Sequence, residues 1–288
     1  MTMMTAWEFS GAAEGAAGCC GDVAFDFALT GGRHAVAVVD VAGHGRTRAR
    51  LSGALAFSVA RHLVAFADPV AALLAADAVL RRDADDLPYA VGFVAVIDAA
   101  FGTIEYASAG FDTAFILSGD AERCPLTATG AMLGAPFMPN LRATMRSFVA
   151  GEALVIATDG AAESRAPSNL RFFGTSGVAD AVRSALRVGD DPARAVYAAA
   201  RRYAGGAQQD DIGVSVLRFA RRVSADYRSE IIAPSALAGD VPGKSMLKIA
   251  PPPGALLTEM RPPWSATNRA VSASPSPLPA MPAAALPR

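Results

Sequence analysis

The stretch HAVAVVDVAGHG, residues 34–45, decides how this chain folds. Its apolar, β-branched first half predicts a strand, and that strand runs directly into Asp40. An ionised carboxylate at such a position is costly unless it is capped, paired or bound to a metal ion. Asp40 could simply cap the helix that follows, since aspartate is favoured at that position. The open loop formed by Gly43 and Gly45 is more than a cap needs, and it favours a functional site.

Three other acidic positions adjoin apolar runs, in the segments Gly21-Asp22, Thr158-Asp159-Gly160 and Asp210-Asp211. Each has a plain structural explanation, as a turn residue or as a solvated surface charge. Hard divalent cations, however, bind carboxylate oxygens held on rigid strand ends, and glycine lets the backbone come close. No comparable set of histidines or cysteines is present. The four positions together therefore predict a metal-assisted hydrolase.

A change in composition near residue 220 divides the chain. With 288 residues, 52% of them hydrophobic, the chain can bury a full core. We expect a flexible N-terminus at residues 1–17, a single domain at 18–220 and a Pro/Ala-rich tail at 221–288. Twelve of the nineteen prolines lie in this tail, which predicts disorder, although its apolar patches at 231–232 and 246–249 could also dock on a partner or on the domain.

Charge and cysteine content exclude several classes of protein. The formal net charge is -1 and the basic residues are dispersed, which argues against nucleic acid as a partner. No segment has the roughly 18 consecutive apolar residues of a membrane span, and the N-terminus is not a signal peptide. Three cysteines without metal-site or disulfide spacing indicate reduced thiols. We therefore expect a cytoplasmic protein that does not bind membranes, and the sequence leaves the oligomeric state unknown.

The order of predicted elements indicates an α+β fold. Strands cluster in the middle of the domain and helices occur in pairs on either side, unlike the regular alternation of a doubly wound sheet. Two packed, mainly antiparallel sheets flanked by helices are therefore expected. The predicted helices cover residues 47–66, 69–82, 176–187 and 192–204, and the predicted strands cover 34–39, 89–98, 103–108, 113–117, 142–148, 153–157 and 212–219.

The motifs occur in an order that resembles a known family. The segments that carry the resemblance are CGD at residues 20–22, VDVAGHG at 39–45, ASAG at 107–110, VAGEALVIATDGAAE at 149–163 and QDDI at 209–212. In this order they resemble the SpoIIE-type branch of the PPM (PP2C-like) serine/threonine protein phosphatases, over roughly residues 18–219. Any one segment alone would be weakly specific.

This resemblance implies an αββα sandwich with two Mn²⁺ or Mg²⁺ ions. By motif, Asp40 would bridge the two ions and the Val41 carbonyl would add a ligand. The second ion would be held by Asp22, Asp159 and Asp210, with Asp211 in support. The implied substrate is phosphoserine or phosphothreonine on a regulatory protein of a bacterial partner-switching pathway, for example an anti-sigma-factor antagonist.

Two alternatives stay open at this point: a non-catalytic phosphoprotein-binding scaffold with the same fold, and an enzyme that hydrolyses a small phosphate ester. Metal-assisted hydrolysis suits the residues independently of the family, because two cations about 3.5–4 Å apart activate a shared water and neutralise phosphoryl charge.

Some features depart from the family pattern. His44 is a candidate to protonate the leaving oxygen, or it is an ordinary loop residue. No arginine precedes Asp22, so Arg46 and Arg48 are the candidates to bind phosphate. Gly213 stands where a threonine is common, a change that bears on substrate binding and efficiency more than on the metal ligands.

Overall fold

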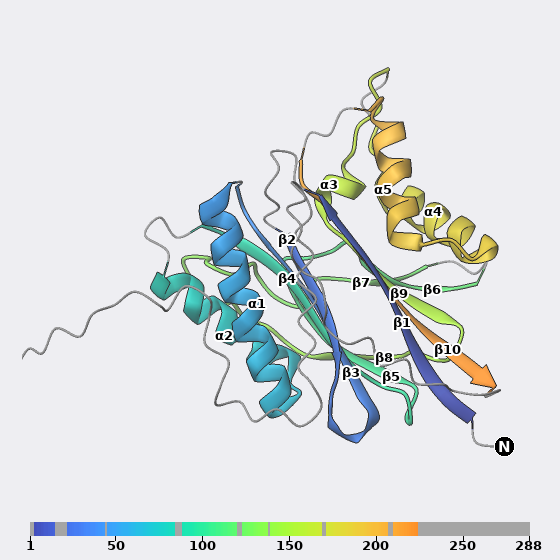
Figure 1. The fold of residues 1–288 in the computed structure, drawn as a ribbon. Helices are drawn as coiled ribbons and strands as arrows, with labels where there is room; N and C mark the ends of the chain where they lie inside the picture. The colour runs from blue at the N-terminus through green and yellow to red at the C-terminus, as the bar shows by residue number, and fades with distance from the viewer. Residues whose placement is uncertain are drawn as a thin grey trace, which may run out of the picture. The chain divides into compact units, whose positions relative to one another are not determined.

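The computed structural model describes residues 3–14, 22–43, 45–83, 88–119, 123–137, 139–168, 171–206 and 210–223. His44 and the predicted tail from residue 224 onward lie outside these ranges, so the expectations for them stay predictions. The described strands form two five-stranded sheets (Figure 1). The first has the order β1-β10-β9-β6-β7 and the second the order β2-β3-β4-β5-β8.

All neighbouring strands in both sheets are antiparallel, as predicted. The bounds in the first sheet are β1 (Met3–Glu14), β6 (Ala114–Ser118), β7 (Cys124–Leu126), β9 (Glu152–Ala157) and β10 (Ile212–Val223). Those in the second sheet are β2 (Asp22–Ala28), β3 (Arg33–Val41), β4 (Ala90–Asp98), β5 (Thr103–Ala109) and β8 (Thr144–Ser147). A 3₁₀ turn, Thr30–Gly32, joins β2 to β3.

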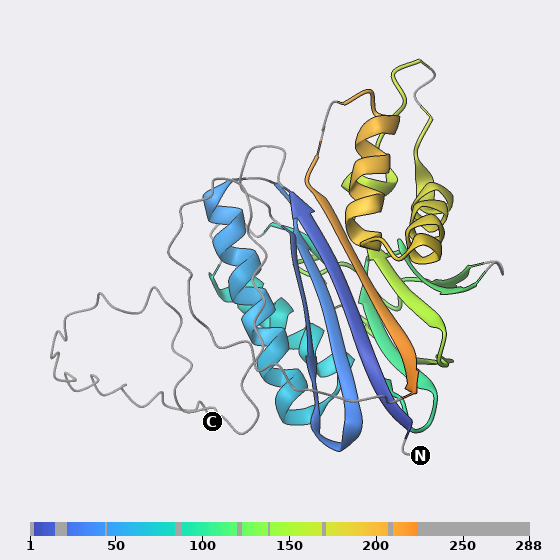
Figure 2. The same cartoon turned by 45° about the vertical axis from the view of Figure 1, so that its right-hand side comes forward.

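The helices cover the outer faces of the two sheets. α1 (Arg46–Phe66) and α2 (Pro69–Asp83) pack on the second sheet, whereas α5 (Pro192–Tyr203) packs on the first and carries α4 (Gly174–Val188) beside it (Figure 2). Asp68 caps α2, because its Oδ1 accepts hydrogen bonds from the backbone of Val70 and Ala71 at 2.8 and 3.0 Å. No helix in the described part of the chain is long and apolar enough to cross a membrane.

Strand β3 shows why the apolar run at residues 34–39 decides the fold. Its alternate residues Ala35, Ala37 and Val39 belong to the core under α1 and α2, while Val36 and Val38 belong to the core between the two sheets. A third core lies between the first sheet and helices α4 and α5. The layers are therefore helix, sheet, sheet and helix, and the predicted αββα sandwich is confirmed.

The N-terminal segment differs from the expected flexible stretch at residues 1–17. Strand β1 pairs with β10 along its whole length, from Met3 opposite Val223 to Glu14 opposite Ile212. Strand β10 also continues three residues beyond the predicted domain end at residue 220. The sequence of β1 contains few β-branched residues, so the long pairing with β10, which no local pattern reveals, accounts for its strand conformation.

Candidate metal and active site

A cavity of about 420 Å³ opens where strands of both sheets end. It brings together all the carboxylates that the sequence predicted as metal ligands, and Val41 lies with them. The second sheet contributes Asp22 and Asp40, and the first sheet contributes residues that follow β9 or precede β10. The cavity is lined by Asp22, Asp40, Val41, Ala42, Gly43, Tyr89, Ala90, Val91, Met132, Asp159, Asp210 and Asp211.

Asp22 and Asp40 face each other across two antiparallel strands. Asp22 begins β2 and Asp40 lies near the end of β3, and the two residues are directly paired in the register. Their side chains therefore share one face, the face that carries Val36 and Val38 into the core between the sheets. Asp22 is 5% exposed and its Oδ2 has no hydrogen-bond partner. Such an unpaired buried oxygen is a suitable donor for a cation.

Both carboxyl groups hold protons more tightly than an ordinary aspartate. Burial raises the pKa of Asp22 well above its usual value, and the nearby charge of Asp40 raises it further. Burial also raises the pKa of Asp40 from 3.8 to about 6, with a further contribution from the charge of Asp159. The site therefore gathers carboxyl groups whose burial and mutual repulsion favour the protonated form, and none of the described residues that line the cavity is basic.

Asp159 reaches the same cavity from the other sheet. It follows β9 and opens the short helix α3 (Asp159–Ala162). Thr158 anchors this turn to β10, because its backbone nitrogen donates to the Gly213 carbonyl and its hydroxyl accepts from the Gly213 nitrogen, both at 2.8 Å. Burial raises the pKa of Asp159, and the charge of Asp210 adds to the effect. The two acidic segments of this sheet are thus adjacent although about fifty residues separate them.

Two glycines allow the acidic segments to converge. A Cβ atom on Gly160 would lie 1.9 Å from the Asp211 carbonyl oxygen, so only glycine fits there. A Cβ atom on Gly213 would lie 2.7 Å from Asp22 Oδ2 and 2.9 Å from a methyl carbon of Thr158. The glycine that replaces the family's usual threonine therefore leaves room for the buried carboxylate of Asp22.

The donor set fits a hard divalent cation. Carboxylate oxygens, backbone carbonyls and water are the ligands of Mg²⁺ and Mn²⁺. Burial, together with the charges of neighbouring aspartates, raises the pKa of Asp22, Asp40 and Asp159, as expected where acids converge on a cation site. In the part of the chain that the structure describes, no three acidic, histidine or cysteine side chains are grouped tightly enough to enclose one ion. The aspartates therefore surround a cavity and do not form a closed ligand shell.

The basic residues proposed from the sequence lie beside the cavity and do not line it. Arg46 is exposed at the start of α1. Arg48 lies next to Gly43, since its Nε would be 3.2 Å from a Cβ atom on that glycine. Their predicted role in binding phosphate stays a prediction.

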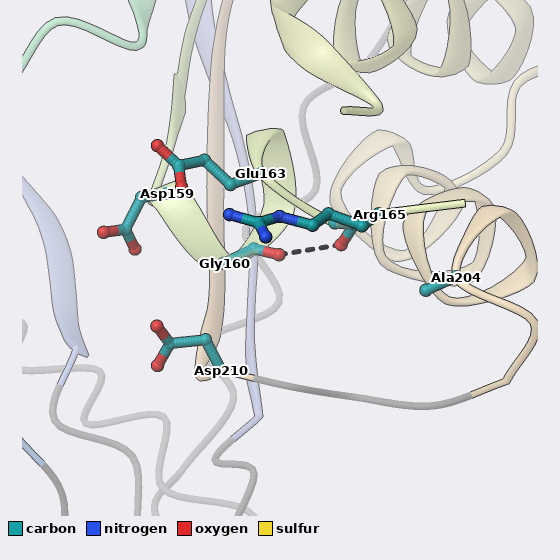
Figure 3. Close-up of a pocket in the computed structure, with 7 residues that line it drawn as sticks. Asp159, Gly160, Glu163, Arg165, Ala204 and Asp210 are labelled. Atoms are coloured by element: carbon teal, nitrogen blue, oxygen red, sulfur yellow. Dashed lines mark hydrogen bonds between the residues drawn. The ribbon is translucent and has the colours of Figure 1, made fainter. Parts of the chain in front are cut away.

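The structure adds a neighbouring pocket that the sequence did not indicate. This pocket, of about 150 Å³, shares Asp159 and Asp210 with the larger cavity and also contains Glu163 and Arg165. Figure 3 shows the Arg165 guanidinium pointing toward the same side as the carboxylates of Asp159 and Glu163. The Arg165 guanidinium also lies 4.9 Å from the centre of the Phe172 ring. Arg165 follows Asp159 by six residues, and this closeness in sequence was the one hint that it could lie at the site. The direction of its side chain cannot be predicted from that spacing.

The stability of the metal-free chain should depend on pH through Asp40. Because its folded pKa is raised, the folded chain keeps a proton between about pH 4 and pH 6 that the unfolded chain has released. The resulting stabilisation is complete below about pH 4 and is lost as the pH rises through 6. In the presence of a chelator, we expect Asp40→Asn to exceed the original chain in unfolding free energy by about 2 kcal/mol near pH 7.5. The difference should shrink to about a third of that value near pH 4.5 and go on falling as the pH drops below 4.

Urea unfolding at the two pH values measures this difference. The value is set below the full free energy of the shift because Asp40 keeps some contact with water. A variant that is less stable than the original chain near pH 7.5 would show that the carboxylate is compensated by groups other than a cation.

Comparison with known families identifies the chain. The family model described as Stage II sporulation protein E (SpoIIE) matches residues 30–220, well over half of the 288 residues. The chain belongs to the SpoIIE family. The family match runs from β3 into β10, and so includes Asp40, Asp159, Asp210 and Asp211.

Among curated proteins, this SpoIIE-family chain is similar to Protein IcfG from Synechocystis sp. (strain ATCC 27184 / PCC 6803 / Kazusa). The two are 34% identical over 100 residues, which are 34% of this chain and 15% of IcfG. The aligned part is thus a small fraction of the length of that relative.

Solved structures show the same fold. The PP2C phosphatase domain of SpoIIE from Bacillus subtilis, solved with a fragment of its regulatory domain, matches with a TM-score of 0.65 and 19% identity, over 77% of this chain and 66% of that one. The RsbU and RsbW domains of Rv1364c from Mycobacterium tuberculosis match with a TM-score of 0.62 and 23% identity, over 76% and 61%. The catalytic domain of the phosphatase PstP, in complex with two manganese ions, matches with a TM-score of 0.54 and 14% identity, over 75% and 100%. This SpoIIE-family chain therefore has the fold of PP2C-type phosphatase domains.

Proposed function

We propose that this chain hydrolyses phosphoserine or phosphothreonine on a bacterial regulatory protein, with a metal-activated water as the nucleophile. One observation carries the proposal: five aspartates from two different sheets line a single cavity where strands of both sheets end. Aspartates placed together at this density repel one another unless cations separate them. A metal-dependent phosphate-ester hydrolase needs such a cluster of acids, whereas a purely structural role does not explain why they converge on one cavity.

The residues that would hold two Mn²⁺ or Mg²⁺ ions are Asp40, the Val41 carbonyl, Asp22, Asp159 and Asp210, with Asp211 in support. Bound there, the ions would lower the pKa of a shared water and neutralise charge on the phosphoryl oxygens. The PstP neighbour carries two manganese ions on the same fold, which supports this number and type of ion. Asp40 must be ionised to act as a ligand, and its pKa of about 6 keeps it ionised at neutral pH.

The other predicted residues would act on the substrate. Arg48, held beside Gly43 at the rim, and Arg46 in the same first turn are proposed to contact the phosphoprotein or its phosphoryl oxygens. His44 is proposed to protonate the leaving serine oxygen, as a group that titrates near neutrality can. Both roles would leave the hydrolytic step without a protein nucleophile.

The proposed substrate is the phosphorylated partner in a partner-switching system, such as an anti-sigma-factor antagonist, and the proposed location is the cytoplasm. A structural neighbour that combines RsbU and RsbW domains in one chain supports a regulatory protein as the partner. A second function, a phosphoprotein-binding scaffold without turnover, is favoured by one observation. Within the described residues, the carboxylates do not form a closed ligand shell.

Removal of metal separates the two functions. We expect a phosphoserine peptide to release phosphate in the presence of Mn²⁺, and we expect a chelator to reduce the release to background. Added Mn²⁺ or Mg²⁺ should restore it, because none of the described residues that line the cavity is a serine, threonine, cysteine or histidine that could act in place of a metal-activated water. Phosphate release is followed over time, with the unphosphorylated peptide as control.

A chain that binds the phosphopeptide but releases no phosphate under any metal would support the scaffold. Rapid turnover of free phosphate metabolites instead of the peptide would support an esterase. Anomalous scattering from a crystal soaked in manganese would locate the ions and test the ligand assignments together.

A further inference from the structure

The aspartate cavity has a second wall that is apolar. Tyr89, Ala90, Val91 and Met132 line it beside the carboxylates, and Val91 is paired with Asp40 across β3 and β4. Tyr89 is 47% exposed and Met132 is 41% exposed, although both are large hydrophobic side chains. A phosphoryl group gains nothing from such a wall, since it is bound by cations and hydrogen-bond donors. The apolar wall is therefore suited to contact a part of the substrate other than its phosphoryl group.

The loop that carries Met132 is firmly held. Its next residue, Leu133, is fully buried and exchanges two backbone hydrogen bonds with Ala90 of β4, at 2.8 and 3.1 Å. Gly110 lies under Met132, because a Cβ atom on Gly110 would be 3.0 Å from Met132 Cβ. The position of Met132 is thus fixed from below by a glycine and from one side by a strand.

A buried ion pair on α2 holds the other end of this loop. Asp77 is 1% exposed, accepts a hydrogen bond from the Gly134 nitrogen at 2.8 Å and pairs with Arg81 Nε at 2.7 Å. Arg81 also donates to the carbonyls of Ala135 and Phe137, at 2.7 and 3.1 Å. Buried charges are costly, so this arrangement specifies one conformation for the loop more than it adds stability. That conformation leaves Met132 exposed at the cavity.

The backbone of Tyr89 is hydrogen-bonded to the loop that follows Val41 at the end of β3. Its carbonyl accepts a hydrogen bond from the Ala42 nitrogen at 2.9 Å, one residue after Val41. Backbone hydrogen bonds therefore hold the chain at both exposed apolar residues, at Tyr89 to the loop after β3 and next to Met132 to β4. Tyrosine and methionine are residue types that bind apolar groups of a partner well.

We infer that Tyr89 and Met132 form a subsite for an apolar side chain next to the phosphorylated residue of the substrate. The partner is thus a polypeptide with a hydrophobic residue within two positions of its phosphoserine. This inference rests on the proposed function and narrows its substrate class. The cavity, at about 420 Å³, has room for such a side chain beside the phosphoryl group.

The test uses the full chain with Mn²⁺ and two fluorescent peptides that contain a non-hydrolysable phosphonate in place of phosphoserine. One peptide has leucine on both sides of the phosphonate and the other has serine. We expect the leucine peptide to bind about ten-fold more tightly, the gain typical of burying one apolar side chain. Met132→Ser and Tyr89→Ser should each reduce this ratio toward one, whereas Met132→Leu should keep it.

The matched control is Phe101→Ser, which removes an even more exposed apolar residue (81%) at the β4–β5 turn, outside the cavity. Its ratio of affinities should equal that of the original chain. A ratio near one in the original chain, or an unchanged ratio in Met132→Ser, would overturn the inference. If the ratio behaves as expected but no phosphopeptide is hydrolysed, the inference stands and the proposed function fails. If phosphopeptides are hydrolysed but the leucine and serine peptides bind equally well, the proposed function stands and the inference fails.

Discussion

Replacing Asp40 with asparagine should lower manganese-dependent phosphate release by about 10³-fold. Asp40 is the carboxylate that pairs with Asp22 across β2 and β3 and that lies beside Val41 in the cavity. Metal ions contribute several kcal/mol of charge stabilisation to phosphoryl transfer, and each 1.4 kcal/mol corresponds to about ten-fold in rate. An amide removes the negative charge that the ions need while the volume of the side chain stays the same. Initial rates on the phosphoserine peptide measure the effect.

The matched control for this variant is Asp26→Asn. Asp26 lies on β2 with Asp22, but its carboxylate is 2.9 Å from His34 Nε2 and it does not line the cavity. We expect this control to keep its rate within a few-fold of the original chain. Since metal-free Asp40→Asn should unfold at higher urea concentration near neutral pH, unfolding cannot explain its loss of activity. Retention of more than a tenth of the rate in Asp40→Asn would remove Asp40 from the metal site.

Gly160→Ala should destabilise the fold by about 3 kcal/mol and remove activity. The new methyl group would lie 1.9 Å from the Asp211 carbonyl oxygen and 2.8 Å from the carbonyl carbon. Backbone atoms cannot rotate away as a flexible side chain can, so α3 and the segment before β10 must separate. Asp159 and Asp210 would then no longer face the same cavity. Urea unfolding and phosphate release together measure both consequences.

Gly53→Ala is the control for that substitution. Gly53 lies inside α1, and a Cβ atom there would have no neighbour within 4 Å. Alanine in a helix interior is favoured over glycine by up to about 1 kcal/mol, so this variant should be as stable as the original chain or more stable. If Gly160→Ala unfolded at the same urea concentration as Gly53→Ala, the two acidic segments would not be in close backbone contact.

Several parts of the fold could be predicted because local pattern and tertiary structure agree. The apolar run before Asp40 is a central strand buried on both faces, and the cap at Asp68 marks the start of α2. The aspartates could be predicted as a group because each lies at the end of an element, where a sheet edge collects them. Their direct cross-strand pairing, Asp22 opposite Asp40, depends on register, which spacing along the chain does not determine.

Other features depend on contacts that are distant in sequence. β1 is a strand because β10 pairs with it, and β7 is three residues long, so neither has a pattern of its own. Tyr89 and Met132 reach the cavity through the pairing of Ala90 with Leu133 and through the buried Asp77. The direction in which the side chains of Arg48 and Arg165 point is decided by packing against Gly43 and Phe172.

The pairing of β1 with β10 has a consequence for how this domain can be joined to others. Met3 and Val223 are neighbours, while the opposite ends of the same two strands lie next to the acidic segments. Twelve paired residues span about 36 Å, so a second domain joined at Met3 or Val223 would be attached far from the aspartates. A partner joined directly to Met3 and one joined directly to Val223 would thus emerge next to each other, at the ends of these strands away from the acidic segments.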